Sequence, residues 1–263
     1  MDGPVPEGGC AVSPRGGQGM IRAIVFDFGQ TLVDSSEGFR AAEKEAQGKA
    51  FAALGLTDRE EFLSVYRAIR TAFHGRSRFS RKAILEEAFR RYGRIPDLLL
   101  LEQWETDYWQ RVQEMTRVFP EAEGVLRKLR ERAYRLALIT NAQGQEEEGR
   151  HRLGNYPELE RLFEVVVVAG ERGIPPKPDP APFRLCLEML GLTPKEAVYV
   201  GDDWRIDVRG AEAVGMQPLW LKHRLVRRNW PVVESAAPVI DSLDELLDIE
   251  KLLKGVRKKC PPV

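Results

Sequence analysis

Short apolar runs alternate with amphipathic segments along the second half of the chain, and this alternation limits the fold more than any other feature. The apolar runs are rich in β-branched residues, which predicts strands at 135–140, 165–169, 197–200, 218–221 and 239–240. The segments before, between and after them predict helices at 121–132, 145–153, 180–190, 207–214 and 242–253. Strands that alternate with helices form parallel sheets covered on both faces, so we expect an α/β fold.

One further strand, at residues 21–26, is separated from this region by a long stretch with a helical period. From about residue 37 to residue 116 the apolar side chains recur at three- and four-residue spacing, without a good strand. We therefore expect a core made of residues 20–34 and 118–263, with the helical residues 35–117 inserted as a cap. Ligands of open α/β sheets bind at the carboxyl ends of the strands, and an insertion that leaves from this edge would overhang the site.

Composition and charge exclude several classes of protein. The 40 Lys and Arg residues balance 40 Asp and Glu residues, which argues against nucleic-acid binding driven by bulk charge. No apolar run approaches the ~20 residues of a membrane span, so no membrane partner is expected. The cysteines Cys10, Cys186 and Cys260 are far apart, which excludes a disulfide scaffold and a zinc ribbon. We expect a cytoplasmic protein that acts on a small molecule; its oligomeric state stays open.

The first residues differ in character from the rest of the chain. Residues 1–19 are rich in Gly and Pro and have neither a basic segment nor a continuous apolar segment, so a disordered tail is expected rather than a signal peptide. Met20 directly precedes the first predicted strand, so translation from Met1 and translation from Met20 both stay open.

Polar residues follow the predicted strands at the points where they end. They are Asp27 after the first strand, Thr140 and Asn141 after the second, Lys177 after the third, and Asp202, Asp203 and Asp207 after the fourth. The carboxyl ends of parallel strands meet at one edge, so we expect these side chains to converge. Acidic side chains can hold Mg²⁺, Lys and Thr can neutralise phosphoryl oxygens, and a remaining Asp can attack phosphorus. This set favours phosphoryl transfer.

These residues also resemble the four motifs of the haloacid dehalogenase-like hydrolases, in the order of that family. The matching segments are DFGQTL at 27–32, Thr140, Lys177 in KPDP, and GDDWRID at 201–207. The resemblance extends from Met20 to about Leu253 and implies a Rossmann-like core with an inserted helical C1 cap. It also implies a Mg²⁺-dependent phosphatase that works through an aspartyl-phosphate.

The resemblance implies a role for each matching residue. Asp27 is expected to be the nucleophile and a metal ligand, and Lys177 to hold both the phosphate and the charge of the nucleophile. The other expected roles are phosphate binding by Thr140 and Asn141, Mg²⁺ binding by Asp202 and the Gly29 carbonyl, and places near the metal for Asp203 and Asp207.

Gly29 departs from the pattern of the phosphatases in this family, which have a second Asp two residues after the nucleophile as general acid and base. Loss of such a group typically slows turnover ~10²–10⁴-fold, so we expect a slow enzyme, unless a cap residue such as His74 supplies the proton. Two alternatives stay open. The chain could be a 2-haloacid dehalogenase, whose members also lack this Asp, or a weakly active phosphate-binding relative.

Overall fold

The computed structural model describes residues 20–142 and 152–257, and its centre is a six-stranded parallel sheet with the order β5-β4-β1-β6-β7-β8. The strands are β1 (Ala23–Phe26), β4 (Arg135–Asn141), β5 (Val165–Ala169), β6 (Ala197–Gly201), β7 (Gln217–Leu221) and β8 (Val239–Ile240). Every predicted strand is present, with ends shifted by at most two residues. If these six strands are numbered 1 to 6 in chain order, their order across the sheet is 3-2-1-4-5-6, with β1 near the centre. This is the strand order of dinucleotide-binding folds.

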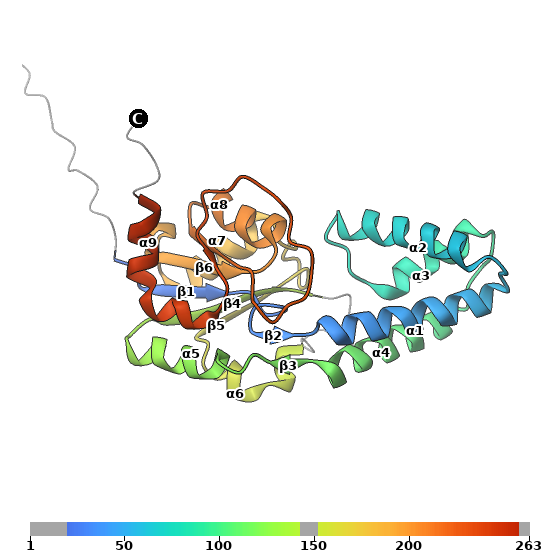
Figure 1. The fold of residues 1–263 in the computed structure, drawn as a ribbon, viewed down its shortest axis with the longest axis horizontal. Coiled ribbons are helices and arrows are strands. Elements are labelled where there is room, and N and C mark those ends of the chain that lie inside the picture. Colours follow the sequence, from blue (N-terminus) through green and yellow to red (C-terminus); the bar gives the residue numbers. More distant parts are fainter. Residues whose placement is uncertain (1–19, 143–151, 258–263) are drawn as a thin grey trace, which may run out of the picture.

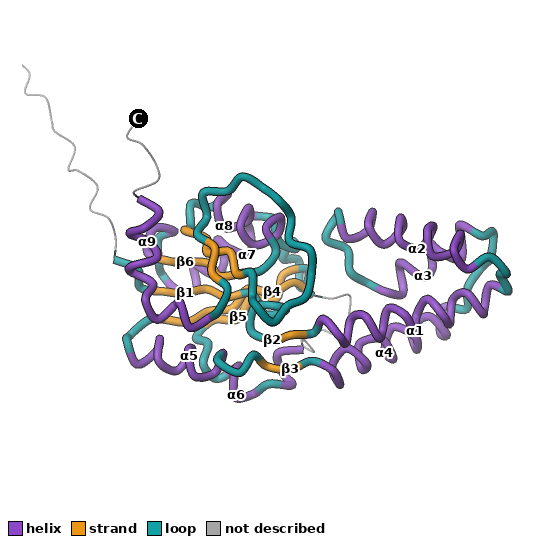
Figure 2. The backbone as a smooth tube through the Cα atoms, in the orientation of Figure 1, coloured by secondary structure: helices purple, strands orange, loops and turns teal. Residues whose placement is uncertain are grey.

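Helices cover both faces of the sheet, which confirms the predicted α/β, Rossmann-like class (Figure 2). One face packs against α5 (Ala122–Glu131), a 3₁₀ turn over Leu243–Asp248, and α9 (Ile249–Arg257). The other packs against α7 (Pro180–Leu190) and α8 (Arg209–Ala213). Successive side chains of a strand point to opposite faces, and both faces are buried here. This burial explains why the strands read as continuous apolar runs.

A helical block lies beside the sheet, at the end where the strands terminate (Figure 1). It consists of α1 (Ser36–Leu54), α2 (Arg59–His74), α3 (Arg81–Arg91) and α4 (Leu98–Met115), so the prediction of helices here is confirmed. The chain enters and leaves the block through an antiparallel ladder of β2 (Val33–Asp34) and β3 (Arg117–Val118). The block has apolar clusters of its own, built largely on Phe62, Tyr66 and Tyr108.

Two predicted helices begin differently from the expectation. The segment predicted as a helix over 207–214 starts as a π-helical turn at Trp204–Val208, because the Asp203 carboxylate accepts from the backbone of Arg205 and Ile206. The segment over 242–253 starts as a 3₁₀ turn before α9.

Other expectations fall on parts of the chain that the structure leaves out. Residues 145–151 of one predicted helix and the predicted tail at 1–19 lie outside the described residues, and Arg152–Asn155 is a 3₁₀ turn. The short α6 (Pro157–Glu160) follows it. Among the helices of residues 20–142 and 152–257, none is long and apolar enough to cross a membrane.

Gly38 and Gly48 of α1 provide a matched test of how closely this helix packs on α4. A Cβ at Gly38 would lie 2.7 Å from the Val112 carbonyl oxygen, whereas nothing lies within 4 Å of a Cβ at Gly48. Gly38→Ala should lower the free energy of unfolding by ~1–3 kcal/mol through overpacking. Gly48→Ala should raise it by roughly 0.5–1 kcal/mol, because alanine favours a helix interior. Urea denaturation measures both, and equal effects of the two substitutions would contradict the packing.

Candidate active site

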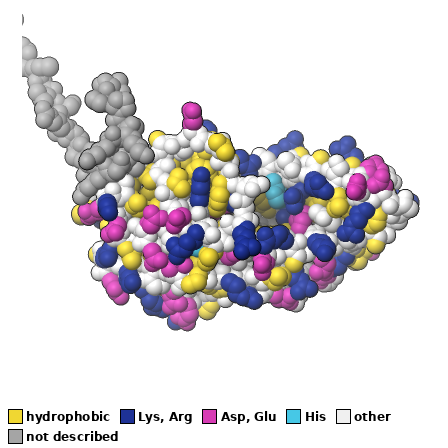
Figure 3. Space-filling view, viewed as in Figure 1, with side chains coloured by type: hydrophobic (Ala, Val, Ile, Leu, Met, Phe, Trp, Pro, Cys, Tyr) yellow, Lys and Arg dark blue, Asp and Glu magenta, His cyan; other side chains and the backbone are white. Residues whose placement is uncertain are grey.

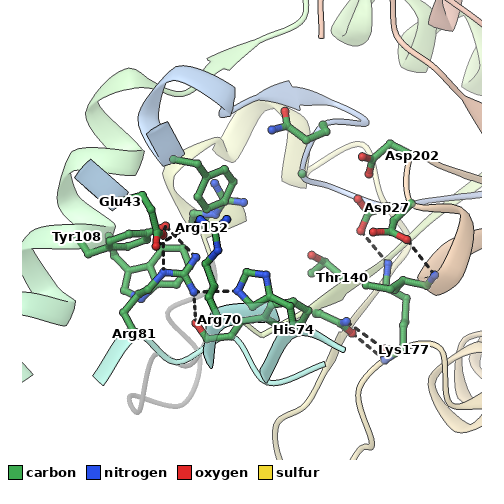
Figure 4. Close-up of a pocket in the computed structure, with 18 of the residues that line it drawn as sticks. Asp27, Glu43, Arg70, His74, Arg81, Tyr108, Thr140, Arg152, Lys177 and Asp202 are labelled. Carbon is green, nitrogen blue, oxygen red and sulfur yellow. Dashed lines mark hydrogen bonds and ion pairs between the residues drawn. The ribbon is translucent and has the colours of Figure 1, made fainter. Parts of the chain in front are cut away.

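A cavity of about 710 Å³ lies between the carboxyl edge of the sheet and the helical block. Figure 3 shows the corresponding hollow between the two parts of the molecule, bordered by Lys and Arg side chains. Asp27, Thr140 and Lys177 line it from the sheet side, and Glu43 and Tyr108 line it from the helices. Figure 4 shows these groups on opposite sides of the space. The structure thus brings the predicted strand-end residues together.

The ammonium of Lys177 is 1 % exposed and lies between two carboxylates. Its Nζ is 2.7 Å from Asp27 Oδ1 and 2.7 Å from Asp207 Oδ1. It also lies 2.9 Å from the Ile139 carbonyl oxygen and 2.8 Å from the Tyr199 hydroxyl. Burial lowers the pKa of Lys177, but the two carboxylates outweigh burial and hold this pKa above its usual value. Lys177 is therefore a fixed positive charge.

The backbone of Lys177 is held from two sides. The Asn141 amide accepts from the Lys177 N–H at 2.8 Å and donates to the Lys177 carbonyl at 3.3 Å. Ser77, from the turn after α2, donates to the same carbonyl at 2.9 Å. Both polar atoms of the Asn141 side chain thus bond to the backbone of Lys177, although this residue was predicted to bind phosphate. Thr140 is buried and lines the cavity as expected.

Three buried carboxylates form an acidic cluster, because Asp27, Asp202 and Asp207 offer oxygens within 4.8 Å of one another. Burial raises the pKa of Asp27 to about 6, against the opposing effect of Lys177. Burial also raises the pKa of Asp202 well above its usual value, against the opposing effect of Arg228. Carboxylates this close repel one another unless a proton or a cation intervenes, so the cluster can hold a divalent metal ion.

Asp203 and Asp207, both expected near a metal, have different surroundings. Asp207 is 2 % exposed and belongs to the acidic cluster, and its Oδ2 accepts from the Asp203 N–H at 2.9 Å. The Asp203 Oδ1 caps the π-helical turn instead, by accepting from the Arg205 N–H at 2.9 Å.

Arg228 was not predicted from the sequence. Its Nη1 is 2.7 Å from Asp202 Oδ2, and its Nη2 donates to the Asp202 carbonyl at 2.6 Å. The Trp220 indole donates to the same carbonyl at 3.0 Å. Arg228 comes from the loop between β7 and β8, 26 residues from Asp202, and nothing in its local pattern distinguishes it from a surface arginine.

Gly29 and Gln30 follow the first strand. Gln30 has a φ of 60°, in the left-handed region that few residues other than glycine adopt. Its side-chain amide accepts from the Ser35 N–H at 3.1 Å and donates to Ser36 Oγ at 3.2 Å. Gln30 is thus engaged at the entry to α1, and no acidic side chain stands at position 29.

A second charged cluster lines the cavity from the helical block, and the sequence analysis named only its His74. Arg81 lies 3.2 Å from Glu43 Oε2 and donates to the Tyr108 hydroxyl at 2.9 Å. Arg81 Nη1 is also 3.1 Å from His74 Nε2, so this nitrogen accepts. Burial and nearby arginines, led by Arg81, lower the pKa of His74 to about 3. This lowered pKa favours the neutral imidazole near pH 7, which argues against His74 as the alternative proton donor.

The family model of haloacid dehalogenase-like hydrolases matches residues 21–215. The chain therefore belongs to the haloacid dehalogenase-like hydrolase family. It is 30% identical over 240 residues to a glyceraldehyde 3-phosphate phosphatase of Methanopyrus kandleri, covering 89% of this chain and 99% of that protein.

Two other similarities bear on the kind of hydrolase. The chain is 41% identical over 108 residues to a phosphoserine phosphatase of Thermus thermophilus, covering 41% of this chain and 42% of that protein. A solved structure of a 2-haloacid dehalogenase from Pseudomonas syringae is 26% identical, with a TM-score of 0.59, and the match covers 88% of this chain and 99% of that one.

Lys177→Met should destabilise the protein strongly, because it leaves Asp27 and Asp207 buried without their counter-charge. Removing one partner of a buried ion pair costs about 3–5 kcal/mol. The loss should shrink as the pH falls, since protonated carboxyls no longer need the cation. Urea denaturation at pH 5 and pH 8 measures both effects, with Lys195→Met as the exposed control. Wild-type stability of Lys177→Met at pH 8 would contradict this description of the site.

Proposed function

We propose that the protein is a Mg²⁺-dependent phosphohydrolase for small phosphorylated molecules, with Asp27 as nucleophile. The observation that carries this proposal is the buried set of one ammonium and three carboxylates at the sheet edge. The matches to named phosphatases support it. The helical residues 35–117 serve as a cap that encloses the substrate against a core of residues 20–34 and 118–263.

The donor atoms fit a magnesium ion. Asp27 and Asp202, with the backbone carbonyl of Gly29, supply the hard oxygen ligands that Mg²⁺ takes in proteins. The raised pKa values of Asp27 and Asp202 reflect carboxylates whose charge the protein alone compensates poorly, and a divalent cation removes that deficit. When bound, Mg²⁺ supplies positive charge to the phosphoryl oxygens.

The residues of the chain then perform two displacements. An Asp27 carboxylate oxygen attacks phosphorus, the ester P–O bond breaks, and the alcohol oxygen leaves with the electron pair. Water next attacks the phosphorus of the aspartyl-phosphate and releases inorganic phosphate and free Asp27. Lys177 fixes the orientation of Asp27 through Oδ1 and, with Thr140, neutralises the phosphoryl oxygens.

Among the described residues, neither position 29 nor Gln30 nor His74 offers the leaving oxygen a proton. Gly29 has no side chain, Gln30 is engaged in the turn, and His74 is neutral with a pKa of about 3. Leaving groups that are stable as anions, such as nitrophenolate, should therefore depart faster than alkoxides.

A 2-haloacid dehalogenase is the second candidate, favoured by Gly29 and by the similarity to the solved dehalogenase. Its substrate carries a carboxylate, which Asp202 and Asp207 would repel in the absence of a cation. The acidic cluster therefore favours the phosphatase. A phosphate-binding relative without turnover is the remaining alternative.

Phosphate release from nitrophenyl phosphate should require Mg²⁺, stop in EDTA, and be absent in Asp27→Asn. Mg²⁺ should also raise the melting temperature of the wild type by mass action, and not that of Asp202→Asn. Asp58→Asn, at the exposed N-terminus of α2, is the matched control and should respond to Mg²⁺ as the wild type does.

Chloride release from 2-chloropropionate is measured in parallel. Chloride release that resists EDTA, without phosphate release, would contradict the phosphatase proposal and support the dehalogenase. Release of neither phosphate nor chloride would support the phosphate-binding relative without turnover.

A further inference from the structure

Arg228 is the cation that pairs with Asp202, and it reaches this carboxylate from outside the cavity. Asp202 lines the cavity next to Asp27, whereas Arg228 does not line it (Figure 4). The Arg228 Nη1 lies 2.7 Å from Asp202 Oδ2, and the Asp202 side chain is only 6 % exposed. A guanidinium this close to a buried carboxylate forms a strong, charge-assisted contact. One oxygen of Asp202 is therefore already engaged by a cation of the chain itself.

Two further contacts hold the guanidinium of Arg228 in place. Its Nη2 donates to the Asp202 carbonyl at 2.6 Å, and its central carbon lies 3.9 Å from the ring centre of Trp230. Trp230 in turn packs edge-on against Trp220, with the two ring centres 6.5 Å apart. An arginine with a paired carboxylate, a bonded carbonyl and a covered face differs from a freely moving surface arginine.

The acidic cluster thus carries counter-charges of two kinds. Lys177 lies between Asp27 and Asp207, and Arg228 contacts Asp202. Three carboxylates against these two cations leave a single net negative charge among the five groups. A divalent ion that binds this cluster therefore meets less attraction than three unpaired carboxylates would offer.

Arg228, unlike Lys177, can leave its carboxylate without disturbing the core. The Lys177 side chain is 1 % exposed, whereas that of Arg228 is 32 % exposed. Arg228 belongs to residues 222–238, which connect β7 to β8 without helix or strand. Connections of this length without secondary structure are uncommon in compact domains and often carry function. Water can solvate the guanidinium here, so the ion pair can open while the sheet stays intact.

We infer that Arg228 is an internal competitor of the divalent cation at Asp202, and that it lowers the affinity of the site for the metal. This inference rests on the Mg²⁺ site of the proposed function. The guanidinium and the metal ion would draw on the charge of one carboxylate, and they repel each other. Coupling between two sites is reciprocal, so Mg²⁺ weakens the Arg228 pair by the factor by which the pair weakens Mg²⁺ binding.

The alternative role for Arg228 is to orient Asp202 for the metal, and it predicts the opposite sign. The Trp220 indole also donates to the Asp202 carbonyl, at 3.0 Å, so this backbone stays held when Arg228 is replaced. The change in charge should therefore outweigh the change in orientation. In the metal-free protein the same arginine supplies the counter-charge that buried Asp202 needs.

The test measures Mg²⁺ binding directly, by isothermal titration calorimetry of the metal-free protein at one pH and ionic strength. Arg228→Gln should bind Mg²⁺ about tenfold more tightly than the wild type, because a unit positive charge next to Asp202 is removed. Arg228→Lys keeps the charge and should stay close to the wild type. Unchanged or weaker binding by Arg228→Gln, or an equal gain in Arg228→Lys, would overturn the inference.

Arg227 provides the matched control, because it is exposed, carries the same charge and lies one residue away. Arg227→Gln should keep the wild-type Kd for Mg²⁺. An equal gain in Arg227→Gln and Arg228→Gln would assign the effect to net charge rather than to the ion pair, and would overturn the inference.

Thermal unfolding adds a readout that does not depend on the Kd. In EDTA the melting temperature of Arg228→Gln should lie below that of the wild type, because Asp202 has lost its counter-charge. Saturating Mg²⁺ should close most of this gap, since the metal replaces the missing charge. A gap of the same size with and without Mg²⁺ would indicate a purely structural role and contradict the inference.

Hydrogen exchange of the wild type needs no variant and decides the outcome if Arg228→Gln does not fold. Mg²⁺ should speed exchange in residues 224–230, because it weakens the ion pair that holds this loop. Unchanged or slower exchange there, at saturating Mg²⁺, would contradict the inference.

The titrations also separate this inference from the proposed function. If neither the wild type nor Arg228→Gln binds Mg²⁺, the metal site fails and the competition fails with it. If both bind Mg²⁺ with the same Kd, the metal site stands and the competition alone fails.

Discussion

The ammonium of Lys177 between Asp27 and Asp207 is the interaction on which the rest of the site depends. It joins the end of β1, the turn after β6 and the loop after β5, three segments that the sheet brings to one edge. Ser77 ties the helical block to the same residue through the Lys177 carbonyl. Both carboxylates and the ammonium are buried. Removing the ammonium alone, or the carboxylates alone, would therefore leave an uncompensated buried charge. The same contact therefore joins three segments of the fold and, in the proposed mechanism, orients Asp27 for reaction.

The sequence predicted the strands and helices that a pattern of neighbouring residues identifies. Buried parallel strands must be apolar on both faces, so 135–140 and 165–169 were evident, and their order along the chain placed Asp27 and Lys177 at one edge. The two-residue ladder of β2 and β3 carries no periodicity and was missed. Arg228 and Arg152 were missed for another reason: each reaches its partner across a distance in sequence, Asp202 and Ser35 respectively, without a spacing that distinguishes it.

Gly29 and Arg152 lie next to each other in the cavity wall. In the proposed mechanism, a glycine stands at the position of the missing proton donor. A Cβ at position 29 would lie 3.2 Å from Arg152 Nη2, so a side chain placed there would meet this guanidinium. The proposed enzyme therefore turns over poor leaving groups slowly.

The central claim is that Asp27 becomes phosphorylated, and mass spectrometry after an acid quench tests it most directly. Wild-type protein mixed with Mg²⁺ and nitrophenyl phosphate should yield a peptide spanning residue 27 that carries one phosphoryl group. The signal should be absent in Asp27→Asn and should decay as phosphate is released. Turnover of the ester with no phosphoryl group on that peptide at any time, or with the group on another residue, would contradict the account.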